Sequence, residues 1–405
     1  MKKIITFGLI EDGAMVQAEN CLIEADGFAL MADNHKGYGM PVGGVALYKD
    51  KISPAGVGFD IACGNKAVKL NIKYADIKER LPEIARLIAD TFSFGVGQKN
   101  DYKVNADLFN SSAWDLDFFK QYPELKNKAQ SQLGTIGGGN HYIDIFKDEL
   151  DYIWVGVHFG SRGLGHTIAS HFMKLAGDNP NIIDETPHCL KAGTQEFTDY
   201  IACMKLAGEY AYAGRDWVCA KTAELIGAEI TEEIHNHHNF AWLEKHNGAE
   251  YWVVRKGATP AFPDQKGFIG GSMGDNAVIV QGVDSDKSKE AFYSTVHGAG
   301  RVMSRTQAVG KRKYIKVERT KSDGTTYMFK ELSYMGGVVN MEEVRKTLAE
   351  RGIILIGAGG DEAPAVYKKL PEVLKLHEGT IKTLHTLTPL IVVMAGNEEY
   401  DPYKD

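Results

Sequence analysis

The sequence has few cysteines, and it places none of them in pairs. Its five cysteines are scattered along the chain without a CxxC spacing, at Cys21, Cys63, Cys189, Cys203 and Cys219. An odd, dispersed set argues against a disulfide framework and favours reduced thiols. We therefore expect a cytoplasmic protein.

Two kinds of segment are also missing. No apolar run reaches membrane-spanning length, and the start "MKKIITFGLIEDG" lacks a small-residue cleavage site, so we expect neither a membrane partner nor a signal peptide. The sequence contains no GxxxxGK[ST] motif, which argues against an NTPase of the Walker type.

Acidic residues outnumber basic residues in this chain. The chain has 46 lysines and arginines against 53 aspartates and glutamates, a net charge of -7. Such a molecule does not attract nucleic acid by its overall charge, so RNA or DNA binding requires a local basic patch. Candidates are "GKRKYIKVERTK", Gly310 to Lys321, and the pair Arg301 and Arg305. The first candidate is more typical of a charged, solvated strand.

The segment "KSDG", Lys321 to Gly324, resembles the Lys-x-Asp-Gly motif of lysine-using nucleotidyltransferases. Alternating strand patterns flank it on both sides, and Asp-Gly between such patterns indicates a β-hairpin turn. We interpret it as a turn.

Glycine is abundant, with 44 residues in clusters that adjoin β-type runs such as "YIWVGV" before His158. Glycines at strand ends predict one site assembled from several loops on a sheet scaffold. Helical periodicity covers residues 74–92, 194–227 and 340–352, and strands dominate between about Tyr251 and Tyr334. Since no repeat or linker divides the chain, we expect one large α+β domain over residues 1–405. It would have a β-sheet core, flanking helices and an active site of Gly-rich loops.

Five of the thirteen histidines lie in Gly- or Asn-rich segments: His35, His141, His158, His238 and His297. Asp60 and Cys63 lie three residues apart in "GFDIACG". Carboxylate, thiolate and imidazole together suit Zn, Mn or Fe. No two of these histidines have a metal-finger spacing, and each alone also fits a structural role.

Arginines in glycine-rich segments suggest phosphate binding. "GSRG" contains Arg162, "GAGR" contains Arg301, and "RKGATPA" contains Arg255 and Lys256. A forked guanidinium beside exposed backbone N–H groups suits a phosphate. His297, next to "GAGR", is therefore a candidate for a histidine that handles phosphate.

The sequence resembles the RtcB-type RNA ligases, the tRNA-splicing ligases, over almost its whole length. The resemblance is carried by an ordered series: "ADNHKGYG", "GVGFDIACG", "GTIGGGNHYIDI", "HFGSRGLGH", "HHNFAW", "RKGAT", "GGSMG", "HGAGRVMSR" and "DEAPAVYK". It implies an RtcB-like fold and the joining of an RNA 3′-phosphate or 2′,3′-cyclic phosphate to a 5′-hydroxyl. GTP is the implied co-substrate and two Mn²⁺ ions are the implied cofactors.

The resemblance also implies roles for individual residues. His297 would accept the guanylyl group, with Asp33 beside it and Arg162 and Arg301 holding RNA-end phosphates. One Mn²⁺ would lie on Asp60, Cys63 and His141, and the other on Cys63, His158 and His238, with the thiolate bridging. The nucleotide side would be formed by Asn140, Tyr142, Asp144, Asn239, Gly271, Ser272, Met273, Gly298, Ala299 and Gly300.

This chain departs from the family pattern on the base and ribose side of the nucleotide. The family usually has Glu at Asp144, Pro at Gly270, a hydroxyl at Ala277 and a lysine where Met394 and Ala395 stand. The metal and nucleophile positions are retained, so these departures leave GTP selectivity open rather than the chemistry.

Several alternatives stay open. They are a metal-dependent RNA-end phosphoesterase, a diverged member with altered nucleotide preference, and a catalytically quiet RNA-binding relative. The physiological RNA, the need for an accessory activator protein, and the choice between monomer and homodimer also stay open.

Overall fold

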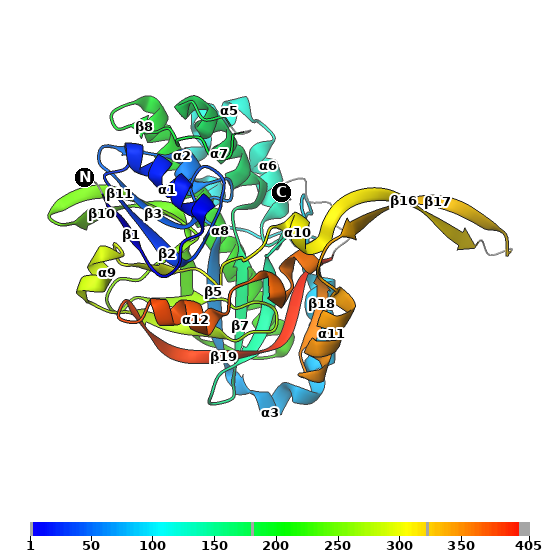
Figure 1. Cartoon of the computed structure of the whole chain (residues 1–405). Helices are drawn as coiled ribbons and strands as arrows, with labels where there is room; N and C mark the ends of the chain where they lie inside the picture. Colours follow the sequence, from blue (N-terminus) through cyan, green and yellow to red (C-terminus); the bar gives the residue numbers. More distant parts are fainter. Residues whose placement is uncertain (1–2, 180–181, 321–323, 397–405) are drawn as a thin grey trace.

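The computed structural model describes residues 3–179, 182–320 and 324–396. Two large β-sheets form the body, helices cover them, and one long hairpin stands away from the rest (Figure 1). The expected α+β fold class is confirmed.

The larger sheet has eight strands, and it curls until its two end strands approach each other. Its order is β13 (Lys266–Ile269), β14 (Ala277–Gly282), β19 (Ile381–Gly396), β6 (Tyr142–Lys147), β7 (Tyr152–Phe159), β5 (Gly64–Lys73) and β9 (Ile230–His237), with β18 (Ile354–Ala358) parallel to β19. Asparagines link the end strand β13 to β9, the other end strand, and to β5 beside it. Asn65 Nδ2 donates to the Phe268 carbonyl at 2.9 Å, and the Phe268 N–H donates to Asn236 Oδ1 at 3.3 Å. The sheet is thereby nearly closed.

The second sheet has five strands. Its order is β1 (Ile4–Thr6), β2 (Gly27–His35), β3 (Val42–Tyr48), β11 (Ala249–Lys256) and β10 (Asn239–His246). Helix α1 (Asp12–Glu24) covers this sheet with its small buried residues Ala14, Ala18 and Cys21. β9 and β10 are consecutive in the chain and separated by His238 alone, so this residue lies where the two sheets meet.

A single long helix serves both hydrophobic cores. α8 (Gln195–Ile226) contributes Tyr210 to the core under the five-stranded sheet and Val218 to the core under the eight-stranded sheet. The Thr194 side chain accepts a hydrogen bond from the Phe197 N–H at its start, and Gly227 ends it in the left-handed conformation. These caps confirm the predicted helix over residues 194–227.

The other predicted helices are present, but one is divided. Residues 74–92 form α3 (Tyr74–Ile77), a 3₁₀ turn and α4 (Leu81–Thr91), because Pro82 has no N–H to continue the ladder and instead suits the first turn of α4. The helix predicted over 340–352 is α11 (Met341–Glu350). The remaining helices and strands are α2 (Pro54–Val57), α5 (Asp117–Gln121), α6 (Leu125–Gln132), α7 (Arg162–Ala176), α9 (Asp286–Glu290), α10 (Arg305–Val309), α12 (Leu370–Leu376), β4 (Lys51–Ile52), β8 (Leu190–Lys191), β12 (Ala258–Pro260) and β15 (Ser294–Val296).

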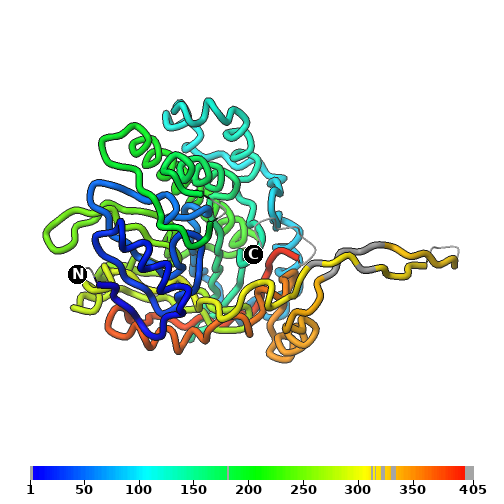
Figure 2. Tube along the Cα trace, turned by 45° about the horizontal axis from the view of Figure 1, so that its top comes forward, coloured from blue at the N-terminus to red at the C-terminus, as the bar shows by residue number. Residues whose placement is uncertain are grey.

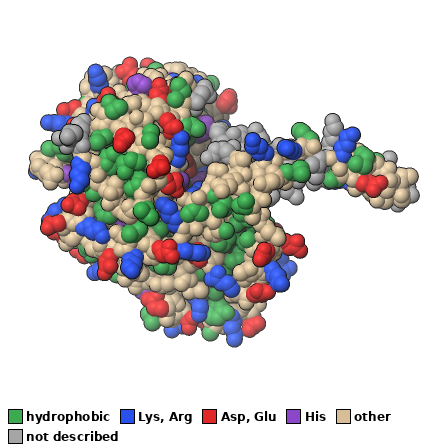
Figure 3. Space-filling view, in the orientation of Figure 1, with side chains coloured by type: hydrophobic (Ala, Val, Ile, Leu, Met, Phe, Trp, Pro, Cys, Tyr) green, Lys and Arg blue, Asp and Glu red, His purple; other side chains and the backbone are tan. Residues whose placement is uncertain are grey.

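The hairpin predicted around "KSDG" is confirmed by strand pairing. β16 (Gly310–Thr320) pairs antiparallel with β17 (Thr326–Gly336) through eleven residue pairs, from Gly310↔Gly336 to Thr320↔Thr326. Lys321 to Asp323 of the expected turn lie outside the described residues. Figures 2 and 3 show this hairpin projecting from the body.

All five cysteines are free. None of the helices in the described part of the chain combines the length and the apolar character that a membrane crossing requires.

Candidate active site

A cavity of about 360 Å³ lies where loops and strand ends of both sheets converge. Its walls include His297 and Arg301, and all ten residues predicted for the nucleotide side: Asn140, Tyr142, Asp144, Asn239, Gly271, Ser272, Met273, Gly298, Ala299 and Gly300. The structure therefore brings together residues that are up to 160 positions apart in the sequence, from Asn140 to Gly300. Their contact with a nucleotide stays a prediction.

The five predicted metal ligands form two groups that share one thiol. The ligand atoms of Cys63, His158 and His238 lie within 4.8 Å of one another, and so do those of Asp60, Cys63 and His141. Strand register produces this arrangement. β5 lies between β7 and β9, with Gly64 opposite both Phe159 and His237, so the residues beside these partners meet at one sheet edge.

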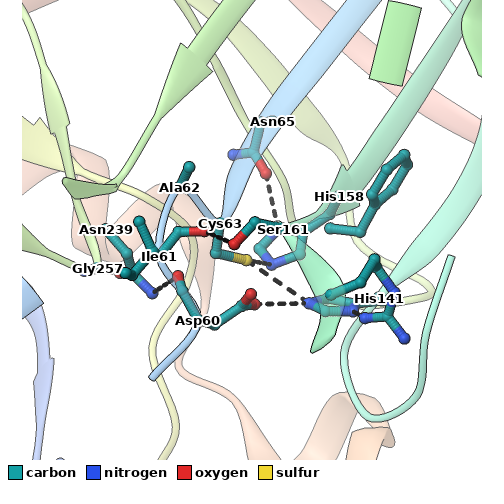
Figure 4. Close-up of polar contacts among 12 residues, drawn as sticks. Asp60, Ile61, Ala62, Cys63, Asn65, His141, His158, Ser161, Asn239 and Gly257 are labelled. Atoms are coloured by element: carbon teal, nitrogen blue, oxygen red, sulfur yellow. Dashed lines mark hydrogen bonds and ion pairs between the residues drawn. The ribbon is translucent and has the colours of Figure 1, made fainter. Parts of the chain in front are cut away.

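The distances within the groups suit a shared cation. Cys63 Sγ lies 3.4 Å from His158 Nε2 and 3.6 Å from His141 Nε2, and His141 Nε2 lies 3.2 Å from Asp60 Oδ2 (Figure 4). An ion about 2.3 Å from sulfur and about 2.0 Å from nitrogen, with tetrahedral angles, separates those two ligands by about 3.5 Å. His238 Nδ1 is buried without a hydrogen-bond partner in the described part of the chain. The residues present therefore fit a metal centre.

Protonation states point the same way. Burial, with neighbouring histidines, holds the pKa of His158 and of His238 well below the usual range, so both rings keep a free lone pair at neutral pH. Burial and the Asp60 carboxylate raise the pKa of the Cys63 thiol well above its usual range. A thiolate at this position therefore requires additional positive charge, which bound dications would supply.

Asn65 fixes the orientation of one ligand and connects it to the candidate nucleophile. Its Nδ2 donates to the carbonyls of Phe268 and of His297, the latter at 3.2 Å, so its Oδ1 faces His158. His158 Nδ1 donates to that oxygen at 2.7 Å, which leaves the Nε2 lone pair directed at Cys63. Such an outer hydrogen bond sets the tautomer of a metal-binding histidine.

Arg215, in the middle of α8, donates hydrogen bonds to the backbone of the segments that carry Cys63 and His158. It is fully buried and donates to the Ala62 carbonyl at 3.0 Å and to the Phe159 carbonyl at 2.5 Å, next to Cys63 and His158 respectively. Burial lowers its pKa to about 10, so it stays cationic at neutral pH and would offset the charge of a thiolate at Cys63. Ala62 holds a positive φ of 62°, an unusual conformation just before the shared ligand.

Sequence reasoning missed Asn65 and Arg215. Asn65 stands two residues after Cys63, and on a strand this spacing places both on one face, so a signal was present. Arg215 lies in an ordinary helical pattern, and no local signal distinguishes it.

Asp33 is fully buried and pairs with His297, a half-buried residue that lines the cavity. Asp33 Oδ2 accepts from His297 Nδ1 at 2.7 Å and from the His297 backbone N–H at 3.0 Å. Burial opposes ionisation of Asp33, but the charge and hydrogen bonds of His297 outweigh it, and the pKa of the carboxyl is lowered. With Nδ1–H committed to Asp33, Nε2 carries the lone pair.

The glycines after His297 allow this close approach. Gly300 has a φ of +77°, and a Cβ there would collide with the Asp33 backbone oxygen. Only glycine adopts this conformation at no steric cost. The segment "HGAGR" therefore lets strand β2 bring Asp33 against His297.

The two predicted phosphate-binding arginines line different cavities. Arg301 lines the first cavity and lies 3.6 Å from Glu362, which offsets part of its charge. Arg162, at the start of α7, lines a neighbouring cavity of about 260 Å³ together with Asp60 and His141. Its Nη1 lies 3.4 Å from His141 Nδ1.

The prediction that Arg255 handles phosphate is wrong. Its side chain is fully buried, pairs with Glu244 at 2.6 Å and donates to Ser294. Successive residues of a strand face opposite ways, so Arg255 points into the core while Lys256 lines the cavity. Burial lowers the pKa of Lys256 to about 8, and its Nζ donates to the Tyr38 carbonyl.

His35 and Ala277 belong neither to the metal-ligand groups nor to the predicted nucleotide residues. His35 lines the cavity but belongs to neither ligand group, and its Nδ1 bonds to the Asp33 carbonyl. Ala277 does not line the cavity. It is buried in the apolar cluster of Phe146 and Phe268, so the missing hydroxyl at this position removes no contact seen in the structure.

The remaining departures do lie together at one end of the cavity. Tyr142, Met273, Val392 and Met394 provide apolar surface around the Asp144 carboxyl. Burial raises the pKa of Asp144 well above its usual range, against a backbone hydrogen bond from Val393. At Gly270, a Cβ would collide with the Tyr142 hydroxyl, so glycine leaves room for that group.

Comparison with known proteins agrees with this geometry. The model of the family described as "tRNA-splicing ligase RtcB" matches residues 16–335. The chain is 33% identical to the RNA-splicing ligase RtcB1 of Escherichia coli strain ATCC 25922 and 32% identical to RtcB of strain K12, in each case over 90% of this chain and 89% of the relative. It is 29% identical to the tRNA-splicing ligase RtcB of Nanoarchaeum equitans, over 95% of this chain and 92% of that protein.

Proposed function

Because this chain belongs to the tRNA-splicing ligase RtcB family, we propose that it is an RNA ligase acting through a guanylylated histidine. It joins an RNA 3′-phosphate or 2′,3′-cyclic phosphate to a 5′-hydroxyl and consumes GTP. The observation that carries this proposal is the hydrogen bond between Asp33 and His297 close to two ligand groups that share Cys63, which lines the same cavity as His297.

In the first step, His297 Nε2 attacks the α-phosphorus of GTP. A P–N bond forms, the bond to the β-phosphate oxygen breaks, and pyrophosphate leaves. Asp33 holds the Nδ1 proton and stabilises the positive charge that the ring gains, because its carboxylate is fully buried 2.7 Å away.

In the later steps, the guanylyl group passes to the RNA 3′-phosphate and the P–N bond breaks. The 5′-hydroxyl then attacks that phosphate, and GMP leaves. A cyclic phosphate is first opened by water. Arg162, which lines a cavity with Asp60 and His141, and Arg301, which lines a cavity with His297, would hold phosphates of the RNA ends.

Two bound Mn²⁺ ions would neutralise phosphate charge and favour the thiolate form of Cys63. Asp60, Cys63 and His141 would hold one ion, and Cys63, His158 and His238 the other. Asn65 keeps the Nε2 lone pair of His158 directed at the site, and Arg215 holds the loop before Cys63.

The proposal extends to the whole chain and its setting. Residues 1–405 act as one ligase domain, since cavity residues run from His35 to Met394. The partner is RNA with cleaved ends, and the five free thiols suit the cytoplasm.

The test is formation of a covalent adduct. Purified protein is incubated with Mn²⁺ and α-labelled GTP, and we expect an acid-labile labelled band, as a phosphoramidate requires. His297→Ala should abolish it, while His188→Ala, at an exposed histidine on the surface, should not. Absence of label with all four NTPs would remove the proposal.

A second candidate is the same reaction with a different nucleotide preference. It is favoured by Met394 and the buried, pKa-raised Asp144 at one end of the cavity. A hydrogen bond to an ionised partner contributes about 1.5–3 kcal/mol, so loss of one such contact weakens discrimination tenfold or more. Adduct yields measured with GTP, ATP, CTP and UTP distinguish the two candidates.

A further inference from the structure

The β16–β17 hairpin extends well beyond the body of the protein (Figures 1 and 2). Each strand has 11 residues, and the two pair only with each other in the described part of the chain. At about 3.3 Å per residue the hairpin is about 36 Å long. Isolated two-stranded hairpins are only marginally stable in water, so a hairpin of this length suits a binding partner.

Both faces of this hairpin carry cations and aromatic rings, and on one face a guanidinium lies over a ring. The pairings Arg319↔Tyr327 and Val317↔Phe329 place alternate residues of both strands on the same side. We call Lys311, Lys313, Arg319, Tyr327 and Phe329 the basic-aromatic face. The Arg319 guanidinium lies 4.7 Å from the centre of the Phe329 ring, which confirms that these two side chains share a face.

The basic-aromatic face is open to solvent. Tyr327 is 41% exposed and Phe329 is 43% exposed, and both lysines are exposed as well. Figure 3 shows basic and hydrophobic side chains exposed along the projecting hairpin. The opposite face also carries a cation and an exposed ring, Lys316 and Tyr314, together with Glu318.

This combination fits a single-stranded nucleic acid better than a second copy of the same face. Exposed rings stack on bases, and lysine or arginine beside them neutralises phosphates. Two copies of the face packed together would instead set lysines against lysines. The rest of the molecule has an acidic excess, with a net charge of -7 overall, so the hairpin is a local site of positive charge.

The hairpin also begins beside the active site. Arg301 and Arg305 line the cavity, and α10, which starts at Arg305, leads directly into β16. A strand whose end lies in the cavity can therefore continue along the hairpin.

We propose that the basic-aromatic face of the β16–β17 hairpin binds the single-stranded RNA adjoining the end that is to be joined. This inference rests on the proposed ligase function and adds to it the surface that recognises the body of the substrate. Because the face contacts bases by stacking and phosphates by charge, it favours unpaired RNA without reading its sequence.

Two matched double variants of the full-length protein test the inference. Arg319→Ala with Phe329→Ala removes one cation and one ring from the basic-aromatic face. Lys120→Ala with Tyr122→Ala removes the same groups from the surface at the end of α5, away from the hairpin, where Tyr122 is 36% exposed. Affinity for a fluorescent single-stranded RNA with a 3′-phosphate is measured by anisotropy over a range of salt concentrations, and adduct formation with GTP is measured without RNA.

We expect the first variant to raise the RNA Kd about tenfold and to reduce the salt slope by about 0.7. The RNA Kd of the control variant should stay within about twofold of that of the parent protein. Adduct formation should be unchanged in both, because neither variant alters the cavity. Lys311→Glu with Lys313→Glu, which keeps the Arg319–Phe329 pair, should also weaken RNA binding.

Equal RNA affinity in all variants would overturn the inference, as would equal losses in the two double variants. A change in oligomeric state of the Arg319→Ala, Phe329→Ala protein with unchanged RNA affinity would assign the face to a second copy and also overturn it. Failure of the parent protein to form an adduct would instead contradict the proposed function, and the binding comparison would still decide the role of the hairpin.

Discussion

Replacing Asp33 with asparagine removes the negative charge that holds His297 while preserving the size of the side chain. In the parent protein Asp33 Oδ2 accepts two hydrogen bonds, from His297 Nδ1 and from the His297 backbone N–H. An asparagine amide that presents its NH₂ there meets two donors. If it presents its oxygen, it accepts both bonds without charge. Either way the imidazolium formed on guanylylation loses its ionised partner.

The magnitude follows from these two contacts. A hydrogen bond to a charged group contributes about 1.5–3 kcal/mol, so two such bonds correspond to about 3–6 kcal/mol. At about 1.4 kcal/mol for each factor of ten, the rate of adduct formation should fall about 10²- to 10⁴-fold. Asp33 is fully buried, so solvent does not replace the lost charge.

The assay is a single-turnover measurement of adduct formation with α-labelled GTP at saturating Mn²⁺. Metal content and thermal stability are measured in parallel, because Asp33 contacts none of the described metal ligands directly and both ligand groups should stay loaded. A rate within threefold of the parent protein, with the metal retained, would refute the assigned role of Asp33. Loss of the metal together with the rate would show that Asp33 acts on the metal centre instead.

Three further predictions concern other parts of the molecule. Cys63→Ser should reduce bound metal from both groups and abolish adduct formation, whereas Cys219→Ser, at a buried thiol outside the cavity, should leave the metal content unchanged by elemental analysis. Glu244→Gln should lower the free energy of unfolding by about 3–5 kcal/mol, because Arg255 is left buried without its ionised partner. Burial opposes ionisation of Glu244, but the charge of Arg255 outweighs it and lowers the pKa of Glu244 in the folded state. The stabilisation by this ion pair is therefore present above the usual glutamate pKa of about 4.3 and is lost as the pH falls through the lowered pKa. Urea titrations at several pH values check this dependence. Met394→Lys should raise the ratio of GTP to ATP adduct about tenfold, and an unchanged ratio would show that this position does not contact the base.

The sequence alone was sufficient for the features that depend on neighbouring residues. Helical periodicity located α8 and α11, and alternating patterns around "KSDG" located the hairpin of β16 and β17. Through the family resemblance, motifs also named many of the residues that line the cavity, among them Cys63, His158 and His297. The helices and the hairpin follow from repeats of 3.6 or 2 residues, which the order of amino acids encodes directly.

Only the tertiary structure decided which of these residues meet, and which side of a strand faces the site. Cys63 and His158 are 95 positions apart, and their contact depends on the register between β5 and β7. Arg255 and Lys256 are adjacent in sequence, yet one is paired in the core and the other lines the cavity. Because side chains alternate along a strand, neighbouring residues point in opposite directions, but the packing of the two sheets determines which direction is inward. For the same reason Arg215 could not be recognised, since its partners are backbone carbonyls that reach α8 only after the sheets have formed.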